Sequence, residues 1–230
     1  MKKIIIMIGP PGSGKGTQAK KIAAKHNYSH ISTGDLLRAL AQKSDLNPAE
    51  KEAVTQMKAG NLVSDRLIYQ LVFDKIEKEL GVGLPGVALA KSGRGVVLDG
   101  AIRNLEQAEG FQKFFEDKNL AAEVLALEVA LSDGDSFDRL TKRRVCTACG
   151  EIIPWLSDTK DLKVCPKCGG KLETRQDDDP KIIKERIAKQ GNEALRPIVN
   201  FYNDLGVLVK IDGNQTIENV EKDIEKVLTT

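Results

Sequence analysis

The chain has 230 residues, of which 41% are hydrophobic, so it is long enough for one large domain or for a core with inserted lobes. Its 35 basic and 33 acidic residues leave a net charge of +2, which argues against binding to nucleic acid or membranes through overall charge. No apolar run is long enough to cross a bilayer, and we interpret the short N-terminal run as a strand rather than a signal peptide. We therefore expect a cytoplasmic protein with no membrane contact.

The first element is an apolar run at residues 3–8, whose continuous hydrophobicity is typical of a central parallel strand buried on both faces. The segment GPPGSGKGTQ follows at residues 9–18, and the pattern of residues 14–26 predicts a helix. A glycine-rich turn between a strand and a helix lets backbone N–H groups approach phosphate, with Lys15 reaching the β- and γ-phosphates. The alternative is a simple Gly-Pro turn with a surface lysine. Thr17 places its hydroxyl one residue later than the general phosphate-loop pattern, because Gly16 follows the lysine.

Helices and strands alternate along the rest of the chain, which predicts an α/β fold with a doubly wound parallel sheet. Ser32 or Thr33 would cap the first of the following helices, and Asp179 with Pro180 would begin a later one. Residues 81–95 are glycine-rich and predict an exposed connection. The helices are expected near 34–41, 48–59, 65–80, 104–118, 180–204 and 216–228, and the strands at 95–100, 123–130 and 207–211.

Charged residues near the predicted strand and helix ends supply the groups that phosphate chemistry needs. Asp99 ends a buried strand, where an acid can hold Mg²⁺ directly or through water, although a turn-forming Asp-Gly is the simpler alternative. Phosphoryl transfer requires positioning and the neutralisation of spreading negative charge, which arginine does well. Taken singly, an arginine is usually a solvated surface charge, and the spacing of these arginines alone does not favour another role. The arginines concerned are Arg38, Arg103, Arg139, Arg143, Arg175 and Arg186.

The four cysteines form two Cys-x-x-Cys pairs, each followed by glycine, and supply four thiolates to one tetrahedral metal site: Cys146, Cys149, Cys165 and Cys168. Zinc is favoured over free thiols or disulfides, while iron also suits four thiolates. A site with four protein ligands keeps no position open for substrate, so its role is structural. His26 and His30 have no matching partners and predict surface or strand-end packing. Trp155 is expected to pack the cysteine-bearing segment rather than to stack on a base.

Together these motifs resemble the adenylate kinase family, in its long form with a metal-bearing lid. The resemblance covers nearly the whole chain and is carried by GPPGSGKGTQ, ISTGDLLR, AGNLVSD, VVLDG, DRLTKRR and ETRQDDDPKIIKER. It implies a P-loop nucleoside-monophosphate kinase fold, a parallel sheet flanked by helices with two inserted lobes. The core would comprise residues 1–31, 64–142 and 178–230, the nucleoside-monophosphate-binding (NMP-binding) lobe residues 32–63, and the zinc-binding lid residues 143–177.

The activity that this resemblance implies is reversible phosphoryl transfer from Mg-ATP to AMP, giving two ADP and serving adenine nucleotide homeostasis. Its cofactors would be Mg²⁺ and a structural Zn²⁺, and the family favours a monomer. One alternative is another monophosphate kinase that uses UMP or CMP as acceptor, or GTP as donor to AMP. A second is a nucleic-acid-binding zinc-ribbon protein, which the near-neutral charge and 4% aromatic content disfavour.

The resemblance also assigns roles to individual residues. The catalytic set would be Lys15, Asp99, Arg103, Arg143, Arg175 and Arg186. ATP would be bound by Gly12, Ser13, Gly14, Lys15, Gly16, Thr17 and Arg139. AMP would be bound by Thr33, Arg38, Val63, Gly100, Arg103 and Gln107. Asp177 and Asp178 would lie at the lid hinge. The family usually has Asp-Gly-Phe-Pro-Arg where this chain has Asp99-Gly100-Ala101-Ile102-Arg103, and we expect a trans peptide bond before Ile102.

Overall fold

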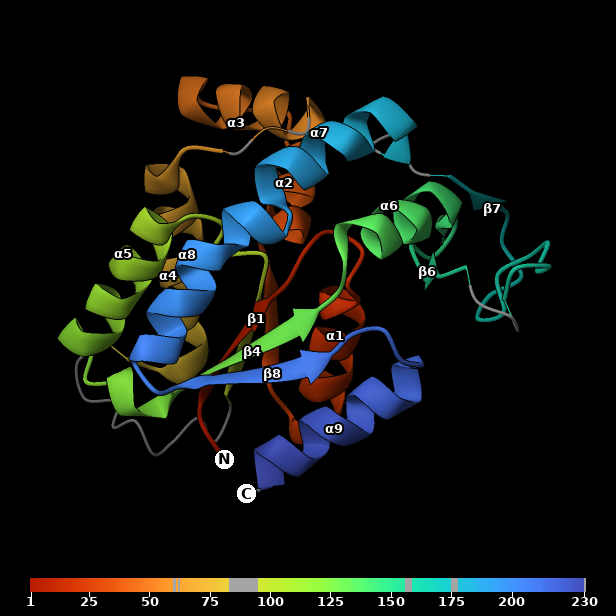
Figure 1. Ribbon diagram of the computed structural model, residues 1–230. Helices are drawn as coiled ribbons and strands as arrows, with labels where there is room; N and C mark the ends of the chain where they lie inside the picture. The colour runs from red at the N-terminus through yellow and green to blue at the C-terminus, as the bar shows by residue number, and fades with distance from the viewer. Residues whose placement is uncertain (60, 62, 83–94, 156–158, 175–177, 230) are drawn as a thin grey trace.

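A computed structural model describes the chain except at residues 60, 62, 83–94, 156–158, 175–177 and 230 (Figure 1). The glycine-rich segment at 81–95 therefore lies mostly outside the described residues, as do Arg175 and Asp177. None of the described helices combines the length and the apolar character that crossing a bilayer requires.

Within the described residues, five strands form one wholly parallel sheet in the order β2-β3-β1-β4-β8, as the alternating pattern predicted. The strand β1 lies in the middle, paired to β3 on one side and β4 on the other. The sheet strands are β1 (Ile4–Ile8), β2 (Ser29–Ser32), β3 (Val96–Asp99), β4 (Val124–Ala130) and β8 (Leu208–Asp212). The strand β2 was not predicted, because it has only four residues and two of them are serines.

Helices cover both faces of the sheet (Figure 1). Successive side chains of a strand point to opposite faces, so Ile4, Ile6 and Ile8 pack under one helical layer while Ile5 and Met7 pack under the other. All five are at most 3% exposed, which explains why the run is hydrophobic at every position.

The helix pair α1 (Lys15–His26) and α9 (Ile217–Thr229) forms one layer, with Ile22 and Ile224 in its core. The opposite layer is built from α4 (Asp65–Leu80), α5 (Leu105–Asp117) and α8 (Asn192–Asp204). The helices α2 (Thr33–Leu40) and α3 (Pro48–Lys58) add Leu37 and Val54 to the core of that layer. A short 3-10 turn, η1 (Ala121–Glu123), leads into β4.

The segment from 180 to 204 is two helices rather than the single helix that its periodicity predicted. The first, α7 (Pro180–Gln190), ends at Gly191, and a β-carbon there would lie 2.4 Å from the Ile187 carbonyl oxygen. The helix α6 (Asp133–Lys142) enforces the break, because Asp133 Oδ1 accepts from both the backbone and the side-chain nitrogen of Asn192, at 3.2 and 2.8 Å. This contact joins residues 59 apart in sequence, so a local pattern does not reveal it.

A second, smaller sheet lies beyond α6 (Figure 1), and one of the four cysteines, Cys146, ends a strand of it. Its antiparallel strands are β5 (Arg144–Cys146), β6 (Ile152–Ile153) and β7 (Leu172–Glu173). Strands of two or three residues leave almost no periodicity, and none of these was predicted. We call the described residues 143–174 the cysteine lobe.

The expected helix caps are present. The Ser32 hydroxyl accepts from the backbone N–H of Asp35, and the Asp179 carboxylate accepts from that of Lys181 ahead of the proline-initiated α7. Each cap satisfies a backbone donor that the helix itself leaves unpaired.

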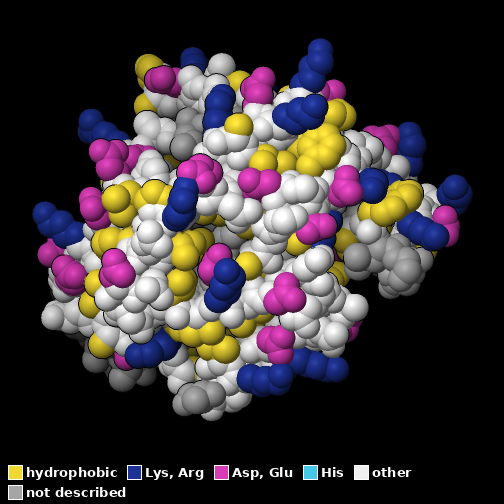
Figure 2. All heavy atoms as spheres, in the orientation of Figure 1, with side chains coloured by type: hydrophobic (Ala, Val, Ile, Leu, Met, Phe, Trp, Pro, Cys, Tyr) yellow, Lys and Arg dark blue, Asp and Glu magenta, His cyan; other side chains and the backbone are white. Residues whose placement is uncertain are grey.

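On the face of the molecule drawn in Figure 2, acidic and basic side chains are interspersed.

Candidate active site

The phosphate-type loop follows β1 at the carboxyl edge of the sheet, the edge where open α/β sheets bind ligands. Gly14 occupies the N-cap of α1 at φ +93°, a left-handed conformation that favours glycine. Gly16 has a different reason: a β-carbon there would lie 3.0 Å from Asp99 Oδ2. The carboxylate of the neighbouring strand therefore occupies the space beside α1 where the general motif has a hydroxyl-bearing side chain.

Lys15 folds back over this loop. Its Nζ donates to the carbonyl oxygens of Gly9 and Pro10 at 2.7 and 2.9 Å. Desolvation lowers the pKa of Lys15 to about 8, with Asp99 acting in the opposite direction and nearby arginines adding to the decrease. The ammonium thus lies in a place that a phosphate would make more favourable for its charged form.

Asp99 lies at the end of β3 with His30 of β2 beside it. Asp99 Oδ2 and His30 Nε2 are 3.6 Å apart, and both side chains are less than one-fifth exposed. Burial alone raises the pKa of Asp99, but the nearby imidazole and the charge of Lys15 outweigh it, so the pKa lies below its ordinary value. The carboxylate is therefore ionised and can hold a cation or a cation-bound water.

A large cleft extends from this loop between the sheet edge, the start of α9 and the cysteine lobe. Every loop residue predicted to bind ATP lines it, from Gly12 to Thr17. Arg139 of α6 lines the same cleft and reaches Asn214 Oδ1 at 3.5 Å. Trp155, which is 42% exposed, also lines it, with the Arg144 guanidinium carbon 5.1 Å from its ring centroid. The tryptophan thus packs on the cysteine lobe as predicted, and it faces the cleft as well.

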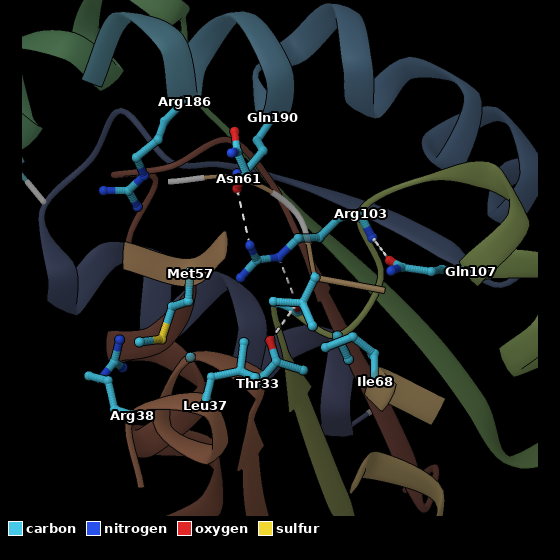
Figure 3. Close-up of a pocket in the computed structure, with 14 residues that line it drawn as sticks. Thr33, Leu37, Arg38, Met57, Asn61, Ile68, Arg103, Gln107, Arg186 and Gln190 are labelled. Atoms are coloured by element: carbon cyan, nitrogen blue, oxygen red, sulfur yellow. Dashed lines mark hydrogen bonds between the residues drawn. The ribbon is translucent and has the colours of Figure 1, made fainter. Parts of the chain in front are cut away.

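A second, smaller pocket lies between α2, α3 and the segment after β3 (Figure 3). The Thr33 hydroxyl donates to the Gly100 carbonyl at 2.6 Å, and Arg103 Nε donates to the same oxygen at 2.9 Å. The six residues predicted to bind AMP all line this pocket: Thr33, Arg38, Val63, Gly100, Arg103 and Gln107. No cis peptide bond occurs among the described residues, so the bond before Ile102 is trans as predicted, and Arg103 still reaches the pocket.

Arginines stand where the two cavities meet. Arg38, Arg103 and Arg186 line both the cleft and the smaller pocket. Burial and the neighbouring charge of Arg186 lower the pKa of Arg103. The lowered pKa means that the surrounding protein does not fully balance the positive charge of Arg103. A phosphate bound at the junction would supply the missing negative charge.

Arg143 and Arg186 share one fully buried carboxylate, that of Asp178. Arg143 makes a two-pronged contact, Nε to Oδ2 at 2.8 Å and Nη2 to Oδ1 at 2.6 Å, while Arg186 Nη1 lies 3.5 Å from Oδ1. The Asp178 side chain is 0% exposed. This acid links the start of the cysteine lobe to α7 and fixes both arginines beside the cleft.

The four cysteine sulfurs gather in the cysteine lobe, all within 4.8 Å of one another. Cys146 and Cys168 Sγ are 3.5 Å apart, and Cys149 and Cys165 Sγ are 3.7 Å apart. A tetrahedral zinc with Zn–S bonds of about 2.3 Å separates its sulfurs by about 3.8 Å, so the cluster has the dimensions of such a site.

Comparison with known proteins matches residues 7–207 to the family model described as adenylate kinase. The chain belongs to the adenylate kinase family. Named adenylate kinases similar to it include one from Lachnospira eligens, 37% identical over 97% of this chain and 99% of the relative. One from Kosmotoga olearia is 38% identical over 97% of this chain and 98% of the relative, and one from Archaeoglobus fulgidus is 34% identical over 97% of each. The parallel sheet with flanking helices is the P-loop nucleoside-monophosphate kinase fold of this family.

Sequence reasoning missed several residues at the site of this adenylate kinase family member. Both histidines have an acidic neighbour: His26 Nε2 lies 2.9 Å from Glu225 Oε1 of α9, and His30 Nε2 lies 3.6 Å from Asp99 Oδ2. Recognising the short strand β2 would have placed His30 next to β3 and Asp99. The pocket-lining residues Met57, Asn61, Ile68 and Gln190 had no local signal. Arg175 was predicted to be catalytic and lies outside the described residues.

Proposed function

We propose that the chain transfers the γ-phosphoryl group of Mg-ATP to AMP, reversibly, giving two ADP. The observation that carries this proposal is the junction of the cavities, where Arg38, Arg103 and Arg186 line both the donor cleft and the acceptor pocket. Transfer between two bound nucleotides needs two sites that meet at a cationic point, because the transferring group carries most of the developing charge there.

The donor would bind with its phosphates on the backbone N–H groups of the loop. Residues 12–17 and the start of α1 supply those groups and the positive end of a helix. Lys15 would leave the Gly9 and Pro10 carbonyls for the β- and γ-phosphates, and Thr17 would donate to a phosphate oxygen. Arg139 would lie against the adenine, since it lines the same cleft beside the start of α9.

The residues near the loop suit a magnesium ion that travels with the nucleotide. Asp99 is ionised beside Gly16, which has no side chain to bind the ion, so the carboxylate would hold it through water. Mg²⁺, when bound, neutralises charge on the β- and γ-phosphate oxygens. His30 would keep the Asp99 carboxylate in position from the other side.

The acceptor would occupy the smaller pocket. Arg38, which Asp35 orients through a 2.6 Å ion pair, and Arg103 would bind the AMP phosphate. Thr33, Val63, Gly100 and Gln107 would surround the adenine. The phosphate would then point toward the donor cleft, so that attacking oxygen and leaving oxygen are in line across the junction.

The remaining catalytic work is positioning and charge stabilisation, with no covalent intermediate. Lys15, Arg103, Arg143 and Arg186 would surround the transferring group, and we assign Arg175 to the same set. Asp178 would hold Arg143 and Arg186 before the nucleotides arrive, so less ordering is needed at the moment of reaction.

The chain would divide into the core (1–31, 64–142 and 178–230), the NMP-binding lobe (32–63) and a lid (143–177). The cysteine cluster would bind one structural metal, with zinc favoured and iron the alternative for four thiolates. Its bonds would hold together a lobe that has few buried side chains of its own.

The test is a matrix of donors and acceptors: ATP, GTP, CTP and UTP against AMP, GMP, CMP and UMP, with nucleoside diphosphate formation measured in each. ATP with AMP should give the highest kcat/KM. The alternatives, a UMP or CMP acceptor or a GTP donor, are not favoured, because the relatives above are all named adenylate kinase. A higher kcat/KM with UMP or CMP, or with GTP as donor, would overturn the assignment.

A further inference from the structure

The amide of Gln107 is held between two partners of opposite character. Its Oε1 accepts from the backbone N–H of Arg103 at 2.7 Å, and its Nε2 donates to Asp65 Oδ1 at 2.7 Å. Gln107 is 2% exposed and lines the acceptor pocket, where Figure 3 shows it beside Arg103. Both of its amide atoms are therefore fixed before any ligand binds.

These partners allow only one orientation of the amide. A backbone N–H can only donate, and an ionised carboxylate can only accept. Rotating the amide by half a turn would set donor against donor at Arg103 and acceptor against acceptor at Asp65. Each mismatch would leave a buried polar group unsatisfied. The orientation follows from the chemistry of the neighbours rather than from the shape of the side chain.

Asp65 itself lies outside the pocket. It is the first residue of α4, where an acid also suits the positive end of the helix, and it does not line the acceptor cavity. Asn104 Nδ2 lies 3.5 Å from the same Oδ1 and donates toward it. The side chain of Asp65 therefore meets the lining of the pocket through its contact with Gln107.

The amide keeps unused hydrogen-bonding capacity for the pocket. An amide nitrogen carries two hydrogens and its oxygen accepts two bonds, and the contacts with Arg103 and Asp65 use one of each. A ligand edge with a donor beside an acceptor complements what is left. The 6-amino group and N1 of adenine form such an edge, whereas a 6-oxopurine has O6 as acceptor and N1–H as donor, the reverse pattern.

We propose that Asp65 is a positioning residue that fixes the Gln107 amide, so that the pocket selects 6-aminopurine over 6-oxopurine monophosphates. This inference rests on the proposed function, in which the pocket takes a purine monophosphate. An asparagine at position 65 can accept or donate, so Asp65→Asn removes one of the two contacts that fix the amide, leaves the Arg103 backbone N–H as the other, and weakens the discrimination. The shape of the pocket is left unchanged by this isosteric substitution.

The experiment compares AMP with IMP as acceptors for wild type and Asp65→Asn, at saturating ATP. The ratio of kcat/KM for AMP to that for IMP should fall about tenfold in the variant, the scale of one mispaired hydrogen bond. The change should appear in KM, with kcat for AMP within about twofold of wild type. Glu106→Gln is the matched control: it removes an exposed acid from the first turn of α5 and should leave the ratio unchanged.

Calorimetric binding of AMP and IMP to the same proteins separates this inference from the proposed function. If wild type does not phosphorylate AMP, the proposed function fails, and the binding ratios still decide the role of Asp65. An unchanged ratio in Asp65→Asn, by kinetics and by binding, overturns the inference. Equal losses for AMP and IMP, with a lowered thermal midpoint, also overturn it because they show a structural role. Asp65→Glu retains a carboxylate acceptor, and recovery of the wild-type ratio in it supports the inference.

Discussion

The phosphate loop and the cysteine lobe line the same cleft, but different forces shape them. The loop is anchored by β1, which pairs with parallel strands on both sides and has every side chain buried. The cysteine lobe has strands of two or three residues, and among its buried residues are two of its own cysteines, Cys146 and Cys165. A large core fixes the first, whereas a cluster of sulfurs takes the place of a core in the second. Changes in the loop should therefore affect chemistry with little effect on folding, whereas changes in the lobe should act by disordering the lobe itself.

The largest expected effect is at the loop. Lys15→Ala should lower kcat/KM for ATP with AMP by about 10³-fold, because it removes the loop cation proposed to bind the β- and γ-phosphates. The urea midpoint should remain close to wild type, since the Lys15 ammonium contacts only loop carbonyls. Lys25→Ala, on the exposed end of the same helix, is the control and should retain activity. Robust activity in Lys15→Ala would refute the assignment of the loop.

Asp178 tests how the cysteine lobe is joined to α7 of the core. Asp178→Asn should destabilise the protein by about 3 kcal/mol in urea unfolding, because Arg143 and Arg186 would lose a fully buried counter-charge. Asp179→Asn is the matched control: it keeps the helix cap of α7 and should change stability by less than about 0.5 kcal/mol. Equal stabilities for the two variants would show that the buried pair contributes nothing.

Removal of a cysteine tests whether a bound metal, in place of a hydrophobic core, keeps the cysteine lobe ordered. Wild-type protein should contain one tightly bound metal per chain, and Cys165→Ser should lose it. We expect activity to fall about tenfold as the lobe loses its order, while the main thermal transition of the sheet remains. Chelator treatment of wild type should give the same result by a second route. Fully active, reduced protein without metal would contradict the site.

The effect expected to be smallest at neutral pH is the pH dependence of the loop. The pKa of Lys15 is about 8 in the folded protein, against an ordinary value of 10.5. At a pH between these two values, Lys15 is therefore mostly protonated in the unfolded chain and mostly neutral in the folded protein. The stability of the nucleotide-free protein should thus gain a contribution from Lys15 as pH rises through this window. ATP binding should weaken, because phosphate requires the charged form, and kcat/KM at pH 9 should lie about tenfold below its plateau.

Thermal unfolding and ATP titrations from pH 7 to 10 would measure both trends. Lys15→Met lacks the titrating group and should lose the stability trend. Parallel curves for this variant and wild type would show that another group is responsible. Opposite trends in stability and ATP affinity for wild type would confirm that this lysine is held for a ligand rather than for the fold.

Much of the fold was predictable because its signals are local. The strand, loop and α1 were predicted together, since glycine conformation, buried apolar residues and helical spacing all fall within residues 3–26. The strand β2 and the three strands of the cysteine lobe were missed because they are too short to show a period. The break at Gly191 was missed because Asp133, far away in the sequence, causes it.

By itself, the sequence determined the parallel sheet, the phosphate loop and the four thiolates, because each depends on residue types at fixed short spacings. Only the tertiary structure decided which charges meet. It placed Asp99 against Gly16, Asp178 between two arginines, and Asp65 behind the amide of Gln107. Such contacts join residues 8 to more than 80 positions apart, and they form only when the strands are in register and the helices pack.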